Sequence, residues 1–214
     1  AGDINAAVDF LSAKGYKNIG LIGHSEGGII APMVASNNQN VKFIVGLAAP
    51  GIPINELMVL QNDKIGRLAG LPDTTLELNK EINTRIYQFI KEYKGNDLQN
   101  DITNYIVKEI QVFPKDKIPA TVKSLTHPWY KYFIAYDPQK NLEKITIPFL
   151  AINGEKDVQV SAKENLNGIE KSLKKANNTN FKIVSLPHLN HLFQTAKTGS
   201  VAEYSQIEET FSPQ

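Results

Sequence analysis

Short apolar runs and stretches with helical spacing alternate along both ends of this chain. The short runs predict buried strands. They cover residues 19–22, 41–47, 147–152 and 181–186. Apolar positions at helical spacing predict helices over 3–13, 27–36 and 161–175. Strands that alternate with helices over short loops form parallel sheets with crossover helices. The pattern therefore predicts an α/β fold with a mainly parallel sheet flanked by helices.

The segment between the second and third predicted strands has helical spacing and no good strand pattern. Apolar positions predict helices over 57–68, 78–90 and 102–110, and a shorter helix around 129–133. A segment of this length is too long for a loop and too regular for disorder. We therefore expect a helical cap over 53–142, inserted into a core formed by 1–52 and 143–214.

The composition of the chain excludes several kinds of partner, nucleophile and metal site. The 214 residues carry 23 Lys and Arg against 22 Asp and Glu, with no long run of one sign, so neither a nucleic-acid nor a membrane-surface partner is expected. The absence of cysteine excludes thiolate nucleophiles, disulfides and cysteine-based metal sites. The four histidines and the carboxylates show no metal-ligand spacing, which predicts no metal site.

The segment Gly23-His24-Ser25-Glu26-Gly27 matches Gly-x-Ser-x-Gly between a predicted strand and a predicted helix. This context is typical of a nucleophile elbow, a turn so sharp that the serine takes a strained conformation. We expect both flanking glycines to be required, because side chains there would collide with the strand or the helix. Ser25 is the predicted nucleophile, and the backbone N–H of Glu26 is the predicted oxyanion donor. His24 is expected to pack beside the strand.

A serine nucleophile needs a base, and the base needs an acid that orients it. Asp157 follows the third predicted strand and is favoured over Glu155, because the longer loop can reach back over Ser25. His191 follows the fourth strand and is favoured over His188, because it lies deeper in the loop before the apolar Leu192 and Phe193. The order Ser, acid, His is that of α/β-hydrolases. Spacing alone leaves both alternatives open.

Aromatic residues gather in the predicted cap. Trp129 and Phe133 are candidates for lining an acyl or leaving-group pocket, and core packing is the alternative.

Together these motifs resemble bacterial carboxylesterases related to prolyl-oligopeptidase-like hydrolases. The resemblance rests on segments 19–28, 136–138, 150–154 with Asp157, 189–195 and 212–213. It implies an α/β-hydrolase fold with a helical cap, ester hydrolysis through an acyl-enzyme, and no cofactor. It also supports Asp157 and His191 as the acid and the base.

The chain departs from this pattern at its ends. The elbow begins at Gly23 after a single helix, whereas several strands precede it in that fold, and a loop there supplies the second oxyanion donor. We therefore expect a C-terminal portion of a longer protein, with weak or no activity in isolation. Its first strand would expose an apolar edge that a homodimer or the missing N-terminal portion could cover.

The leading functional hypothesis is a serine esterase that acts on small carboxylic esters. A serine peptidase or a thioesterase would use the same triad. A hypothesis from another class is an inactive fragment that binds a partner through its open sheet edge.

Overall fold

The computed structural model describes residues 1–213, and the chain divides into two compact units. The first unit comprises Ala1–Ile52 and Pro138–Gln214, and the second comprises Pro53–Asp137. The expected boundary at residue 142 thus lies too late. Helix α8 (Gln139–Leu142) belongs to the first unit, because Leu142 joins its core and the Ser36 hydroxyl donates to Asn141 Oδ1 at 3.0 Å.

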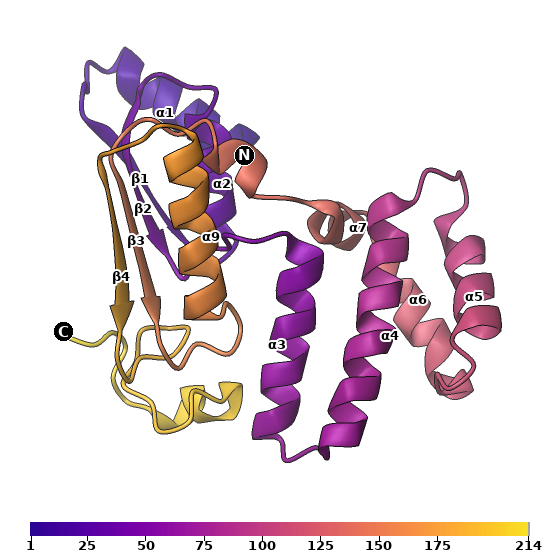
Figure 1. The fold of residues 1–214 in the computed structure, drawn as a ribbon. Helices are drawn as coiled ribbons and strands as arrows, with labels where there is room; N and C mark the ends of the chain where they lie inside the picture. Colours follow the sequence, from indigo (N-terminus) through magenta and orange to yellow (C-terminus); the bar gives the residue numbers. More distant parts are fainter. Residues whose placement is uncertain (214) are drawn as a thin grey trace. The chain divides into compact units, whose positions relative to one another are not determined.

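The first unit is built on a four-stranded parallel sheet (Figure 1). Its strands are β1 (Ile19–His24), β2 (Val41–Leu47), β3 (Phe149–Gly154) and β4 (Phe181–Leu186), paired in that order. This topology confirms the predicted α/β fold. Strand β3 begins two positions later than the apolar run, after Pro148, which has no N–H to donate to a ladder.

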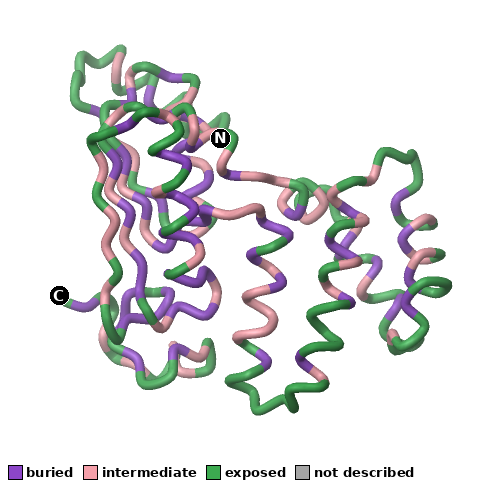
Figure 2. The backbone as a smooth tube through the Cα atoms, viewed as in Figure 1, coloured by how far each residue is buried: buried purple, intermediate pink, exposed green. Residues whose placement is uncertain are grey.

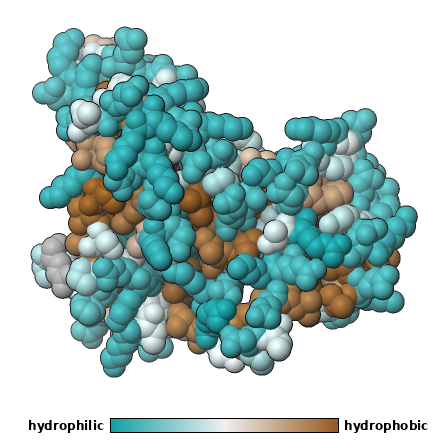
Figure 3. All heavy atoms as spheres, viewed as in Figure 1, coloured by the Kyte–Doolittle hydropathy of each residue, from teal (hydrophilic) through white to brown (hydrophobic). Residues whose placement is uncertain are grey.

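Helices pack on one face of this sheet and bury it. These helices are α1 (Gly2–Ala13), α2 (Gly27–Ala35), α8 and α9 (Ala162–Lys175). A 3-10 helix, η2 (Val201–Gln206), comes after β4 in the chain. Ile44 and Ala151 point into a core that includes Ile169 and Leu173 of α9. These side chains are 0–1% exposed. Buried residues recur along the strands and along α9 (Figure 2). The solvent side of α9 is hydrophilic (Figure 3), as its amphipathic pattern requires.

The opposite face of the sheet is also apolar, but fewer side chains cover it than cover the helix-packed face. The register places Ile22 beside Val45, and Val45 beside Leu150, in one row on this face. Ile22 is 71% exposed, and among residues 1–213 strand β1 pairs only with β2. Near the carboxyl ends of the strands, Leu189 and Phe193 cover this face in a small second cluster.

The second unit is helical throughout. It contains α3 (Ile54–Leu68), α4 (Asp73–Glu92), α5 (Leu98–Glu109), the 3-10 helix η1 (Lys115–Lys117), α6 (Ile118–Leu125) and α7 (Pro128–Ala135). Its core includes Ile54, Ile90, Ile102 and Ile106, all at most 1% exposed. In the described part of the chain, no helix has the length and apolar character needed to cross a membrane.

Candidate active site

The nucleophile elbow lies between β1 and α2, with Ser25 in the left-handed region at φ 54°. A non-glycine residue with this φ is uncommon, and such strain persists only where neighbouring structure enforces it. Here the Ser25 N–H donates to Leu47 O at 2.9 Å, and the Ser25 carbonyl accepts from the Gly28 N–H at 2.9 Å. Strand β2, through Leu47, and helix α2, through Gly28, therefore hold Ser25 in this conformation.

Two glycines make this turn possible, but they are not the expected pair. A Cβ on Gly23 would lie 2.1 Å from Gly27 O, and a Cβ on Gly28 would lie 2.4 Å from the Ala49 Cβ. A Cβ on Gly27 would meet nothing within 4 Å. The expectation that both motif glycines are sterically required is thus wrong for Gly27, and the close approach of helix to strand occurs one residue later.

Glu26 is the N-cap of α2, with helical φ and ψ of −55° and −33°. Its backbone N–H therefore belongs to the first turn, where the helix carries partial positive charge. A developing oxyanion on a group bonded to Ser25 would lie beside this end of the helix.

Asp157 is 1% exposed in the loop that follows β3. Its Oδ1 accepts from the N–H groups of Gln159 and Val160, both at 2.8 Å. Its Oδ2 accepts from His191 Nδ1 at 2.7 Å. Glu155, the alternative acid, faces elsewhere and accepts from the Ser185 hydroxyl at 3.3 Å.

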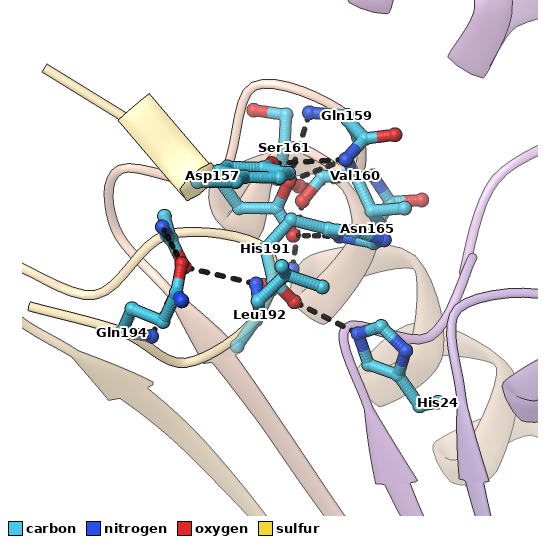
Figure 4. A network of polar contacts seen from close by, with 12 residues as sticks. His24, Asp157, Gln159, Val160, Ser161, Asn165, His191, Leu192 and Gln194 are labelled. Carbon is cyan, nitrogen blue, oxygen red and sulfur yellow. Dashed lines mark hydrogen bonds and ion pairs between the residues drawn. The ribbon is translucent and has the colours of Figure 1, made fainter. Parts of the chain in front are cut away.

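His191 is 5% exposed and lies in the loop after β4. Because a carboxylate can only accept, Nδ1 carries the proton in the bond to Asp157, and Nε2 of the neutral ring is left as a proton acceptor. His188 is exposed and has a positive φ of 68°. The structure therefore brings Asp157 together with His191 (Figure 4) and leaves His188 apart from this pair.

Buried amides give the His191 loop its shape. Asn190 Oδ1 accepts from the N–H groups of Leu192 and Gln194 at 2.9 and 3.0 Å, and Asn190 Nδ2 donates to Gln194 Oε1 at 2.9 Å. Gln194 Nε2 in turn donates to Glu209 O at 3.0 Å. This network fixes the backbone on both sides of His191.

Tyr204 of η2 lies near the acid loop and accepts a hydrogen bond from Gln159 Nε2 at 2.9 Å. Burial raises the pKa of Tyr204, and the Asp157 charge adds to the rise, while the bond from Gln159 opposes it. The hydroxyl therefore stays neutral near the Asp157 carboxylate.

Residues 100–211, more than half of the chain, match the prolyl oligopeptidase family. The chain belongs to that family. Residues 5–105 match a second family, described as BAAT / acyl-CoA thioester hydrolase C terminal. The first match contains Asp157 and His191, and the second contains Ser25. The chain has the fold of the α/β-hydrolase superfamily. No curated protein matches it in sequence.

Solved structures also resemble this prolyl oligopeptidase family member. An esterase from Pyrococcus furiosus is 16% identical, with a TM-score of 0.43, over 86% of this chain and 50% of its own. A lipase-esterase related protein from Clostridium acetobutylicum is 21% identical, with a TM-score of 0.42, over 87% of this chain and 65% of its own. The chain thus spans about half the length of the Pyrococcus furiosus esterase.

Trp129 lies in the helical unit of this family member, where it lines a cavity of about 440 Å³ with Lys123, His127 and Tyr130. Trp129 is 48% exposed, and Phe133 stacks on it with ring centroids 4.9 Å apart. Within residues 1–213, no cluster of three or more His, Asp and Glu side chains could hold a metal ion.

Sequence reasoning missed His24. This residue does not simply pack beside β1, because its Nε2 donates to the His191 carbonyl at 2.8 Å. Its place directly before Ser25 in the motif was the available signal, but the fold decides which loop it meets.

Proposed function

We propose that this chain carries the catalytic machinery of a serine hydrolase that cleaves carboxylic esters through an acyl-enzyme on Ser25. One observation carries the proposal: the buried Asp157 holds His191 in the tautomer that leaves Nε2 as a proton acceptor, in the same unit as a strained serine elbow. An acid, a base and a serine in these roles are the parts of a catalytic triad.

The proposed reaction begins when His191 Nε2 takes the Ser25 hydroxyl proton as Oγ attacks the ester carbonyl carbon. The carbonyl oxygen becomes an oxyanion beside the Glu26 N–H, and Asp157 stabilises the imidazolium. Collapse breaks the bond to the alcohol oxygen, which takes the proton from His191. Water then hydrolyses the acyl-enzyme by the same steps and restores Ser25.

Within the described residues, no hydrogen bond joins the Ser25 hydroxyl to His191. Catalytic hydrogen bonds are often long without substrate and shorten in the substrate complex. Proton transfer in this proposal therefore requires Ser25 and His191 to approach each other when the acyl group binds.

The same machinery suits thioesters and peptides, and the match of the Ser25 half to an acyl-CoA thioester hydrolase family favours a thioester as the second candidate. A panel of p-nitrophenyl acetate, an acyl thioester and an aminoacyl amide would rank the three substrate classes by kcat/KM. The proposal expects the ester to have the highest value.

The decisive test compares ester hydrolysis by the wild type, Ser25→Ala and Ser205→Ala. Ser25→Ala should lower kcat by about 10³-fold or more, because the nucleophile is lost. Ser205→Ala, which removes an exposed hydroxyl in η2, should match the wild type. Equal rates for the wild type and Ser25→Ala on all three substrates would overturn the proposal.

A further inference from the structure

His24 is the last residue of β1 and directly precedes Ser25. We propose that His24 is a positioning residue, which fixes the backbone of His191 relative to the nucleophile elbow by donating a hydrogen bond to the His191 carbonyl. The inference deepens the proposed function, since it rests on the roles given there to Ser25 and His191.

The contact spans 167 positions of sequence and joins β1 to the loop after β4. The His24 ring also packs against the His191 ring, with centroids 4.7 Å apart and planes tilted by 45°. The Phe193 ring makes an edge-type contact with the His24 ring, with centroids 6.2 Å apart and planes at 65°. His24 thus contacts both the backbone and the imidazole of His191. Figure 4 shows the hydrogen bond from its ring to the His191 carbonyl.

The acceptor determines the tautomer of His24. A carbonyl oxygen can only accept, so Nε2 of His24 carries a hydrogen and is committed to this bond. Nε2 of His24 is therefore not available as a proton acceptor. His191 is held at two points, its ring by Asp157 and its backbone by His24.

Among the described residues, the His191 loop contains no helix or long strand, and the amide network that shapes it does not reach β1. Its regular pairing is one isolated bridge between Leu189 and Thr195. Other hydrogen bonds of the loop run to the acid loop and the C-terminal segment, as from Lys156 N–H to Leu189 O and from Ser212 N–H to Phe193 O. The bond from His24 connects the loop to the end of β1, directly before Ser25.

A small error in this alignment has a large effect on rate. Misplacing a catalytic group by about 1 Å can cost about 10²-fold in turnover. Loss of the His24 bond should therefore lower kcat more than it raises KM, because the link aligns His191 and has no proposed part in substrate binding.

Two variants separate the hydrogen bond from simple packing. His24→Leu keeps a side chain of similar bulk but has no donor, whereas His24→Gln offers an N–H at a similar reach. We expect His24→Leu to lower kcat for p-nitrophenyl acetate about 10-fold to 100-fold with little change in KM. His24→Gln should recover most of the loss.

A second readout does not depend on turnover. The His191 Nδ1–H bonded to Asp157 should give a strongly downfield proton NMR signal, and its exchange rate with water reports how firmly the loop is held. We expect the signal in the wild type, with faster exchange in His24→Leu and near wild-type exchange in His24→Gln.

Wild-type kcat and exchange in His24→Leu would overturn the inference. So would a folded His24→Gln that behaves like His24→Leu, because the ring rather than the hydrogen bond would then matter. If the wild type shows no Ser25-dependent turnover, the proposed function fails, and the exchange rates still decide whether His24 positions His191.

Discussion

At the residue scale, the elbow distinguishes two adjacent glycines that the motif alone does not separate. Gly28 faces Ala49 so closely that a Cβ would lie 2.4 Å from the Ala49 Cβ and 2.8 Å from its Cα. Gly27 has open space at its Cβ position and begins helix α2. We predict that Gly28→Ala destabilises the protein by about 1–3 kcal/mol through overpacking. Gly27→Ala should be neutral or stabilise it by up to about 1 kcal/mol.

Urea unfolding of the two variants measures the difference, and each serves as the other's control. Both changes add one methyl group at neighbouring positions in the first turn of α2, so their intrinsic helix propensities are the same, whereas Gly28 is buried and Gly27 is only partly buried. Equal unfolding free energies for the two variants would contradict the close contact between α2 and Ala49.

The residues of the candidate site differ in how far their roles can be predicted from the sequence. The order of serine, acid and histidine follows from which loop comes after which strand, so the strand pattern restricts the acid and the base to these loops. It leaves Glu155 and His188 open beside Asp157 and His191. His24 and Gly28 differ, because their roles depend on which segment lies within a few ångströms. That proximity is set by packing between elements distant in sequence.

At the element scale, long periodic segments are predictable and short ones are not. Helix α4 extends over Asp73–Glu92 and was expected over 78–90, so the helix was predicted but its first turn was missed. Helices α6 and α8 were not expected, although α7, which has the same length of eight residues as α6, was. Short helices show too little repeated spacing to be predicted consistently. Tertiary contacts define such helices, as when Leu142 of α8 packs into the core of the first unit.

The short helix η2 contains a carboxylate whose hydrogen bonds should make the stability of the protein depend on pH. Glu203 in η2 accepts from the N–H groups of Thr198 and Gly199, each at 3.0 Å. Hydrogen bonds from Thr198 first, and from Gly199, lower the pKa of Glu203, although burial opposes the shift. A carboxyl whose folded-state pKa is lowered adds stability above its unfolded pKa, and this stability is lost as pH falls through the folded value.

We therefore expect Glu203→Gln to unfold more easily than the wild type at neutral pH, with a difference that shrinks below about pH 4. Urea unfolding at several pH values measures this difference. Glu208→Gln is the matched control, since Glu208 is exposed and makes no hydrogen bond within residues 1–213. A constant gap between wild type and Glu203→Gln down to low pH would contradict the lowered pKa.

At the scale of the whole molecule, the groups placed in the proposed chemistry all lie in the first unit. Ser25, Asp157 and His191 belong to it, as does His24. The alternation of strands and helices predicted this unit, and the long helical segment predicted a separate insertion. The exact point of return, after Asp137, could not be predicted, because it depends on the packing of α8.

The chain leaves the first unit and returns to it at neighbouring points. Gln139 Nε2 donates to Gly51 O at 3.2 Å in the first unit, and the Ile54 N–H donates to Tyr136 O at 3.1 Å in the second. Replacing residues 53–137 with a short Gly/Ser linker should therefore leave the sheet and its loops folded. We expect cooperative urea unfolding and a retained downfield NMR signal from the His191 Nδ1–H.

The matched control adds Asp157→Ala to the linker variant, which removes the acceptor and should abolish that signal while the helical content measured by circular dichroism is kept. A linker variant that loses both cooperative unfolding and the signal would show that the helical unit is part of a single folding core. Retention of both would show that the acid–base pair is organised by the first unit alone, because Asp157, His191 and the amides of Asn190 and Gln194 that shape the His191 loop all lie there.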